Sequence, residues 1–156
     1  MIDKKHVGRI VSRHSVEVEQ GKLRFFAKAI GETDPVYTDE SVAAGRGHAR
    51  LAVPPTYLFC LEMEKPDPYD WFEGVGLELQ KVLHGEQSFS YRQPCFAGDV
   101  LSFEARIDDI YDKKNGALEF LIKSTRVSNQ HGEHVADLRA VIVQRHRRMR
   151  DDRDRV

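Results

Sequence analysis

The sequence predicts an α+β fold in which one antiparallel sheet wraps around a central apolar helix. Two observations carry this prediction. The second half of the chain contains segments in which apolar and polar residues alternate, as in half-buried strands. The first half contains a helical segment that is apolar on nearly all sides, and an antiparallel sheet needs such a layer to cover one of its faces.

The length and composition indicate one domain. The chain has 156 residues and is 40% hydrophobic, which is enough for a single core. No apolar run reaches the roughly 18 residues of a membrane span, and the N-terminal stretch has no signal-peptide pattern. The net charge of −1 indicates no polyanionic partner. We therefore expect a soluble, cytoplasmic protein that binds neither nucleic acid nor membranes.

The first predicted elements are a strand, a helix and a short second helix. Residues 8–18 alternate loosely and fit a short strand. Residues 18–31 place apolar side chains at helical spacing, and Gly31 fits the C-terminal cap. Residues 38–45 predict a short helix, which Thr38 or Asp39 caps and Gly45 ends.

The central helix is predicted within residues 53–65, with its body over 55–64. Proline is tolerated at a helix start because the first N–H groups have no partner inside the helix. The two prolines that follow, Pro66 and Pro68, end it. Its apolar side chains cover most of the circumference, so we expect a buried helix.

The remaining segments predict strands over 78–94, 99–112, 116–129 and 133–146. The pair Asn115-Gly116 is typical of a tight hairpin turn. Consecutive hairpins give an antiparallel meander, and wrapping it around the helix gives the hot-dog arrangement.

The charged tail and the cysteines carry no strong functional signal. We expect residues 1–146 to form the hot-dog domain and residues 147–156 to form a charged, flexible tail with self-compensating charge. Cys60 and Cys95 fit buried free thiols better than a disulfide. No metal-ligand spacing is present, and we expect neither a metal nor a cofactor.

Three stretches in order, "AIGETDPVYTDE", "LAVPPTYLF" and "HGEQSFSYRQPCFAGDVLSFEARI", resemble the MaoC-like (R)-specific hydratase and dehydratase family. Within it, the chain is most similar to dehydratase-like N-terminal halves and to the subunits of mycobacterial heterodimeric hydroxyacyl dehydratases that lack full catalytic machinery. The resemblance covers roughly residues 5 to 145. The Pro-x-x-x-Gly-Asp pattern of Pro94 to Asp99 is its most specific part.

The resemblance points to the loop over residues 31–40 as the active-site position. Catalytic members carry Gly-Asp-x-Asn-Pro-x-His there, and in this chain Glu32 stands at the Asp position, Asp34 at the Asn position and Tyr37 at the His position. Hydration of an enoyl thioester needs a base near neutral pH and an acid on the same face. Histidine titrates near about 6.5, whereas tyrosine titrates near about 10 and mostly stays a phenol. Glu32 and Tyr37 are thus candidate catalytic residues at altered positions. The alternative interpretation of Glu32 is a solvated loop acid, and that of Tyr37 is a packing residue.

The start of the central helix is the second position that the resemblance indicates, because family members direct a backbone N–H there at the thioester oxygen. Free N–H groups at a helix start stabilise a developing enolate. Pro54 and Pro55 have no N–H, and we expect those of Thr56 and Tyr57 to remain available. The candidate substrate-binding residues are Pro55, Thr56, Tyr57, Phe59 and His84.

Four basic residues near this region are weaker candidates. His84 also fits a structural role beside a strand. His48 is expected in solvent, and Arg46 and Arg50 on either side of it fit phosphate contacts or an ordinary charged surface.

The leading hypothesis is a lyase-type protein acting on a 2-enoyl or 3-hydroxyacyl chain carried by CoA or a carrier protein. The chain would be the substrate-binding half of a two-hot-dog unit, in a heterodimer with a catalytic MaoC-like subunit, or a homodimer that uses Glu32. The alternatives are a non-enzymatic acyl-CoA-binding module and a thioesterase. The thioesterase fits poorly, because Glu62 and Glu64 lie late in the central helix.

Overall fold

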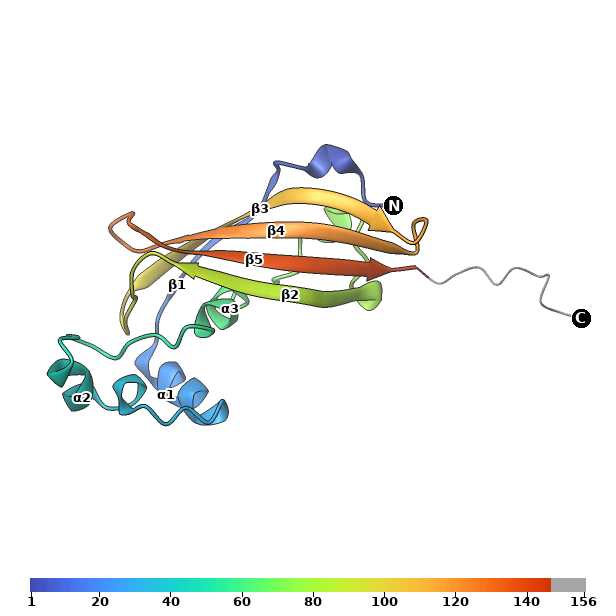
Figure 1. Cartoon of the computed structure of the whole chain (residues 1–156). Helices are drawn as coiled ribbons and strands as arrows, with labels where there is room; N and C mark the ends of the chain where they lie inside the picture. The colour runs from blue at the N-terminus through green and yellow to red at the C-terminus, as the bar shows by residue number, and fades with distance from the viewer. Residues whose placement is uncertain (147–156) are drawn as a thin grey trace, which may run out of the picture.

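A five-stranded antiparallel sheet forms the body of the protein in the computed structural model, which describes residues 1–146 (Figure 1). The charged tail predicted over residues 147–156 lies outside the described residues. The strand order is β1-β3-β4-β5-β2, so β1 and β2 are the two edge strands. The strands are β1 (Ile10–Glu17), β2 (Val82–Tyr91), β3 (Val100–Lys113), β4 (Leu118–Ser128) and β5 (His134–Arg145).

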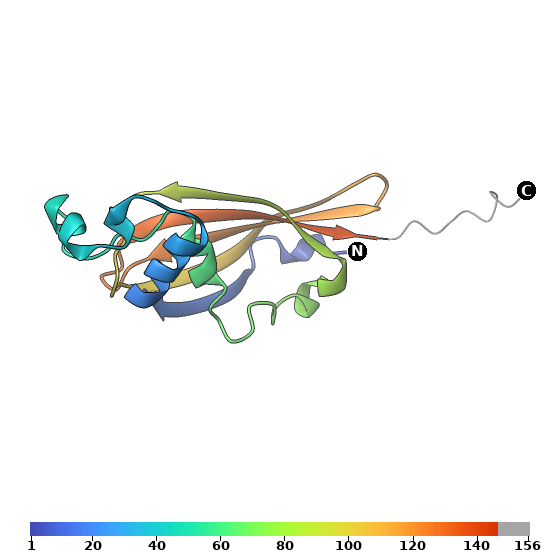
Figure 2. The same cartoon turned by 90° about the horizontal axis from the view of Figure 1, so that it is seen from below.

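Three α-helices lie on one side of this sheet. Figures 1 and 2 show α1 and α2 gathered below one end of the sheet, with α3 closer to its middle. The helices are α1 (Gln20–Ala29), α2 (Glu40–Gly45) and α3 (Tyr57–Glu62). Four 3₁₀ turns lie at Lys4–His6, Pro35–Tyr37, Glu73–Val75 and Leu79–Lys81. This arrangement confirms the predicted α+β hot-dog fold.

The turn residues explain several element ends. Asn115 and Gly116 have φ values of 52° and 77°, which confirms the predicted hairpin turn between β3 and β4. Gly31 follows α1 with φ of 70°, the left-handed conformation that a helix cap needs. Helix α2 ends at Gly45, as predicted. The left-handed glycine lies two residues later, at Gly47, with φ of 85°.

The central helix is shorter than predicted, with residues 57–62 helical where 55–64 were expected. Pro54 and Pro55 precede the helix rather than forming its first turn. Leu58 and Leu61 are fully buried, while Phe59 and Cys60 are only half-buried, so one side of α3 is partly open. The strand predicted from residue 78 likewise starts later, at Val82, because residues 79–81 form a 3₁₀ turn.

The core consists of two apolar clusters on the inner face of the sheet. One lies around α1 and α3 and includes Leu23, Leu58 and Leu138. The other lies at the far end and includes Trp71 and Leu121.

Between the two clusters lies a buried ion pair. Glu62 of α3 accepts hydrogen bonds through Oε1 from Lys123 Nζ at 2.7 Å and from Thr125 Oγ1 at 2.5 Å. Lys123 and Thr125 point inward from β4 between Leu121 and Val127, which belong to different clusters. A polar layer therefore divides the apolar core.

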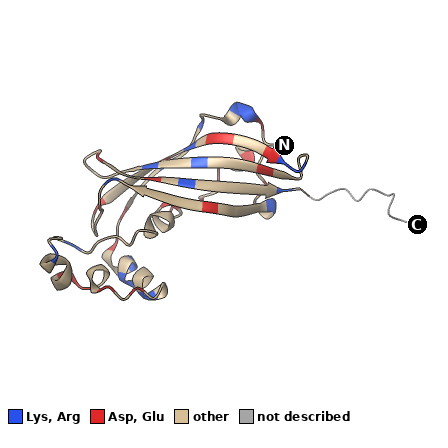
Figure 3. Ribbon diagram, viewed as in Figure 1, with Lys and Arg blue, Asp and Glu red and all other residues tan. Residues whose placement is uncertain are grey.

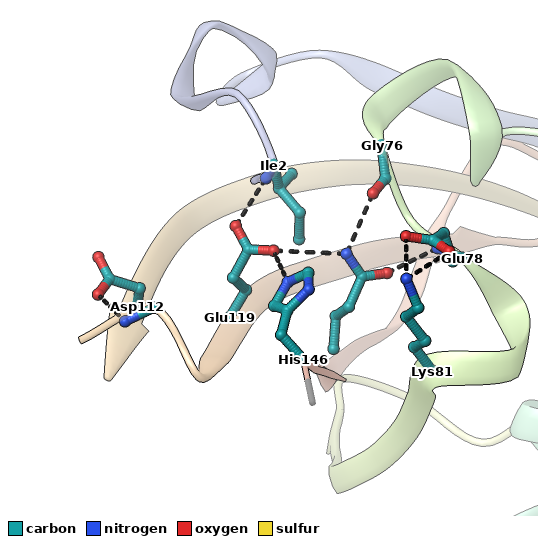
Figure 4. A network of polar contacts seen from close by, with 9 residues as sticks. Ile2, Gly76, Glu78, Lys81, Asp112, Glu119 and His146 are labelled. Atoms are coloured by element: carbon teal, nitrogen blue, oxygen red, sulfur yellow. Dashed lines mark hydrogen bonds and ion pairs between the residues drawn. The ribbon is translucent and has the colours of Figure 1, made fainter. Parts of the chain in front are cut away.

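A polar network closes the far end of the sheet (Figure 4). The buried carboxylate of Glu119 accepts hydrogen bonds from the backbone N–H of Ile2 at 2.7 Å and from Gln144 Nε2 at 3.4 Å, and it pairs with His146. Gln144 also donates to the carbonyl of Gly76 at 3.1 Å. These contacts tie the N-terminal segment and the last strand to β4.

The Pro-x-x-x-Gly-Asp pattern forms the turn that enters β3. Gly98 has φ of 81°, which a side chain would strain. The buried carboxylate of Asp99 accepts from the backbone N–H of Phe96 at 2.8 Å, from Arg50 at 2.8 Å and from Gln130 at 3.2 Å. The motif is therefore a structural clamp that joins three loops at the end of the sheet where α1 and α2 lie.

Charged residues of both signs are interspersed over the strands and helices (Figure 3). On the outer face of the sheet, Arg13 pairs with Glu104 of the neighbouring strand at 2.7 Å. Within residues 1–146 no helix combines the length and the apolar character needed to cross a membrane. Cys60 and Cys95 are both free thiols, as predicted, although only Cys95 is fully buried.

Candidate functional site

The loop after α1 is built from carboxylates that cap backbone N–H groups. Asp34 precedes the 3₁₀ turn Pro35–Tyr37 and accepts from the N–H of Val36 at 3.0 Å. Asp39 caps α2 through the N–H groups of Ser41 and Val42, as predicted. The side chains of short polar residues thus fix the path of the loop below the sheet.

A cavity of about 410 Å³ lies between this loop, the segment before α3 and the end of β2. Its lining mixes polar and apolar groups: Asp34, Val36, Tyr37, Arg46, His48, Ala52, Val53, Pro55, Tyr91, Gln93, Pro94 and Cys95. We call it the loop cavity. It brings together Tyr37 and Pro55, two of the predicted site residues, which lie far apart in the sequence.

Glu32 is not among the residues that line the loop cavity. Its Oε1 accepts hydrogen bonds from the backbone N–H groups of Thr33 and Asp34, both at 2.8 Å. The carboxylate therefore holds the turn that leads into the cavity. Its remaining contribution to the cavity is its charge, which acts on the neighbouring Tyr37.

Tyr37 lies in the wall of the loop cavity as a neutral phenol. Burial raises its pKa, and the negative charges of Glu32 and Asp34 raise it further, against a smaller opposite effect of Arg46. A phenol with a raised pKa donates hydrogen bonds well but is a poor base near neutral pH. Its position suits it to hold a polar group of a ligand.

Arg46 and His48 are the basic groups of the loop cavity. Arg46 donates to Asp34 at 2.7 Å, and this hydrogen bond lowers the pKa of Asp34 and raises that of Arg46. The ring of His48 packs on Phe96, with 5.2 Å between centroids, so His48 is half-buried and the expectation that it is solvated is wrong. Arg50 points instead to Asp99 and does not line the cavity.

The start of α3 offers fewer free N–H groups than predicted. The N–H of Tyr57 donates to the carbonyl of Pro54 at 2.9 Å, which corrects the expectation that it is available. Thr56 is the exposed residue that precedes the helix. The buried ring of Tyr57 packs on Phe26 at 4.8 Å between centroids, and burial raises its pKa to about 12. Tyr57 is therefore mainly a packing residue.

A second cavity, of about 190 Å³, lies further along α3 and is mostly apolar. Its lining includes Phe59 and His84, whose rings pack at 5.2 Å between centroids. The other lining residues are Met63, Pro68, Tyr69, Trp71, Phe72, Leu79, Val82, Leu83, Lys123, Ala140 and Ile142. We call it the helix cavity. Two predicted substrate-binding residues thus meet here, and not in the loop cavity.

The two cavities follow one another between α3 and the edge strand β2. Pro55, just before α3, lines the first cavity, and Phe59 and Met63 line the second. On β2, Tyr91 lines the first cavity and His84 the second.

Most other lining residues were missed in the sequence. Tyr91 is the last residue of β2 and Cys95 lies in the loop that follows it, but nothing local in the sequence shows that β2 ends beside the loop after α1. Lys123 alternates within β4 like any strand residue, and its inward direction follows only from its pairing with Ile107 and Ala140. Within residues 1–146, no group of three or more His, Cys, Asp or Glu residues has the geometry to hold a metal ion.

Comparison with known proteins identifies the family. Residues 5–138 match the family described as "FAS1-like, dehydratase domain region", so the chain belongs to this family. A UPF0336 protein of Streptomyces avermitilis is 32% identical over 145 residues, covering 92% of this chain and 95% of that protein. A UPF0336 protein of Streptomyces coelicolor is 34% identical over 129 residues, covering 83% and 85%.

Solved structures share the fold. The C-terminally truncated HadBC (3R-hydroxyacyl-ACP dehydratase) complex from Mycobacterium tuberculosis matches with a TM-score of 0.77 and 24% identity, over 88% of this chain and 96% of that chain. The R-hydratase PhaJ1 from Pseudomonas aeruginosa matches with a TM-score of 0.68 and 21% identity, over 90% and 83%. The family match over residues 5–138, together with this shared fold, confirms the MaoC-like hot-dog family that the sequence motifs indicated.

Proposed function

We propose that this protein binds an acyl thioester, a 2-enoyl or 3-hydroxyacyl chain on CoA or a carrier protein, as the substrate-binding half of a hydratase or dehydratase. The observation that carries the proposal is the succession of two cavities between α3 and β2. The polar loop cavity suits the thioester and its neighbouring oxygen atoms. The apolar helix cavity suits the hydrocarbon tail, because burying each methylene contributes about 0.8 kcal/mol.

The individual site residues take different parts in this proposal. Tyr37 and Pro55 border the thioester end, and Phe59 and His84 border the tail. Thr56 and Tyr57 position the start of α3 beside the loop cavity.

We assign the chain as a substrate-binding half because the loop over residues 31–40 offers no suitable acid–base pair. Glu32 is engaged with two backbone N–H groups, and Tyr37 has a raised pKa. Neither group is suited to take and return a proton at neutral pH. In the proposed unit, a second hot-dog subunit brings the acid and the base.

The edge strand β2 is the proposed surface for that subunit. One side of β2 pairs with β5, and within the described sheet the other side has no neighbouring strand. Leu83 and Tyr91 of this strand are 57% and 41% exposed and offer apolar surface beside this free edge. Pairing along β2 would bring the catalytic groups of a partner next to both cavities.

One observation favours a second version, in which the chain is active by itself as a homodimer. His48 lines the loop cavity with Tyr37, and histidine is the side chain that titrates near neutral pH. In this version His48 acts as the base, and Tyr37 or Glu32 assists.

The test combines a binding assay with a turnover assay on the purified chain. We expect calorimetry to show micromolar binding of a saturated acyl-CoA, and spectrophotometry to show no hydration of crotonyl-CoA by the chain alone. The variant Leu83→Trp should weaken binding by narrowing the mouth of the helix cavity, whereas Val7→Trp, at an exposed position that lines neither cavity, should not. Turnover that His48→Gln abolishes would favour the homodimer, and absence of any acyl-CoA binding would refute the proposal.

A further inference from the structure

A third cavity, of about 20 Å³, lies against the inner face of the sheet beside the end of α3, and we call it the core chamber. Its polar and charged lining residues are Ser12 and His14 from β1, Glu62 at the end of α3, Lys65 just after that helix, and Lys123 from β4. None of these residues lines the loop cavity. The core chamber thus gathers an imidazole, a carboxylate and two ammonium groups away from the loop over residues 31–40.

The ring of His14 is held beside the core chamber by two contacts. It stacks on Phe103 of the neighbouring strand, with 5.0 Å between centroids and 10° between the ring planes. Its Nε2 atom lies 3.2 Å from the carbonyl oxygen of Leu61 in α3. Because a carbonyl only accepts hydrogen bonds, Nε2 must carry the proton, and in a neutral imidazole the Nδ1 atom is then an acceptor.

The carboxylate of Glu62 presents a second acceptor. Its Oε1 atom accepts from Lys123 Nζ at 2.7 Å and from Thr125 Oγ1 at 2.5 Å. Its Oε2 atom and the Nδ1 atom of His14 are both buried, and neither has a hydrogen-bond partner within residues 1–146. A buried acceptor without a donor is costly. Two residues that line one small chamber therefore each need a donor.

The size and the charges of the core chamber limit what can supply that donor. One water molecule needs a cavity of about 10–15 Å³, so about 20 Å³ admits a single water and nothing much larger. A cation would lie beside the ammonium groups of Lys65 and Lys123, and an anion would lie beside the carboxylate of Glu62. A water molecule is neutral, and it brings two O–H donors at once.

We propose that the core chamber binds one water molecule, which donates one hydrogen to Nδ1 of His14 and the other to Oε2 of Glu62. The oxygen of this water can accept a third hydrogen bond from the ammonium group of Lys123, which lines the same chamber. Three hydrogen bonds are typical of a buried water. The bridge joins β1 to α3 and β4 inside the core, so it does not depend on the proposed function.

The experiment counts long-lived internal water molecules by oxygen-17 magnetic relaxation dispersion. We expect His14→Phe to lower the count by one, because phenylalanine keeps the stacked ring but has no nitrogen lone pair. The carbonyl of Leu61 keeps a partner in this variant, since it also accepts from the N–H of Glu64 at 3.2 Å. An unchanged count in His14→Phe would overturn the proposal.

The matched control is His84→Phe. The ring of His84 likewise packs on a phenylalanine, Phe59 at 5.2 Å between centroids, and its Nε2 lies 3.0 Å from a backbone carbonyl, that of Glu86. It does not line the core chamber, so we expect its replacement to leave the water count unchanged. A loss of one water in both variants would show that the count does not report on the core chamber, and it would also overturn the proposal.

Two measurements on the native chain keep the test decisive if His14→Phe does not fold. Nitrogen-15 spectra of the histidine rings at mildly alkaline pH should show His14 with its proton on Nε2 and none on Nδ1. A proton on Nδ1 would overturn the proposal, because His14 could then donate directly to Glu62. A high-resolution crystal structure should show one density peak within hydrogen-bonding distance of both His14 Nδ1 and Glu62 Oε2, and the lack of such a peak would contradict the bridge.

Discussion

The replacement Asp99→Asn tests how much the clamp of the Pro-x-x-x-Gly-Asp motif contributes to stability. Asparagine has nearly the same shape as aspartate, so the replacement opens no cavity. It removes the charge and turns one of the two acceptor oxygens into a donor. Asp99 Oδ2 accepts from Phe96 N–H, and Oδ1 accepts from Arg50 and Gln130, so an asparagine can serve only one of these two sides.

The expected loss follows from these contacts. Asp99 is 6% exposed, so a donor left without its acceptor there costs about 1–3 kcal/mol. The Arg50 side chain is 47% exposed, and solvent screening reduces its share to about 0.5 kcal/mol. We expect a total of about 2–3 kcal/mol, which lowers the melting temperature of a chain of this size by roughly 5–10 °C.

Urea unfolding followed by circular dichroism measures this change. The matched control is Asp108→Asn, which weakens the solvent-facing pair with Arg106 and should stay within about 0.5 kcal/mol of the native chain. A loss below about 0.5 kcal/mol for Asp99→Asn would refute the reasoning, because it would mean that the buried donors find other partners.

Two further predictions concern titratable groups. Burial raises the pKa of Glu119, but its hydrogen bonds with His146, Ile2 and Gln144 outweigh this effect and hold the pKa below the usual value. The stability that Glu119 provides is therefore complete above its unfolded pKa and is lost as the pH falls through its folded pKa. Glu119→Gln should flatten the acid side of a plot of unfolding free energy against pH, and an unchanged slope would contradict the assignment. Burial raises the pKa of the Cys95 thiol to about 12, whereas Cys60 is half-buried and its pKa is raised less. Iodoacetamide at mildly alkaline pH should alkylate Cys60 well before Cys95, as followed by mass spectrometry, and the reverse order would show that Cys95 is accessible.

The sequence predicted the structure best where an element depends on residues that are close together in the chain. Alternation located β3, β4 and β5, and the Asn115-Gly116 pair located the turn between β3 and β4. The ends of α3 were less predictable, because the prolines on either side of this segment allow a helix over 55–64, whereas only residues 57–62 are helical.

The candidate site depends on distant contacts, so less of it was predictable. The loop over 31–40 was recognised from its motif, and its capping carboxylates were readable from local chemistry. The packing of His48 on Phe96 and the burial of Glu62 beside Lys123 join segments that are far apart in the sequence. The role of Glu32 in the turn depends on the backbone geometry of the loop. A charged residue in a strand pattern is expected on the outside, and only the strand register shows that Lys123 points inward.

The polar layer of Glu62, Lys123 and Thr125 has a consequence for the motions of the molecule. Because the two apolar clusters meet at charged and hydroxyl groups, the contacts that hold one cluster together are largely independent of those that hold the other. Such a division favours separate units of local opening, each with its own amide-exchange free energy. We therefore expect amide exchange at the end that contains the loop over residues 31–40 to be independent of amide exchange at the end held by Glu119.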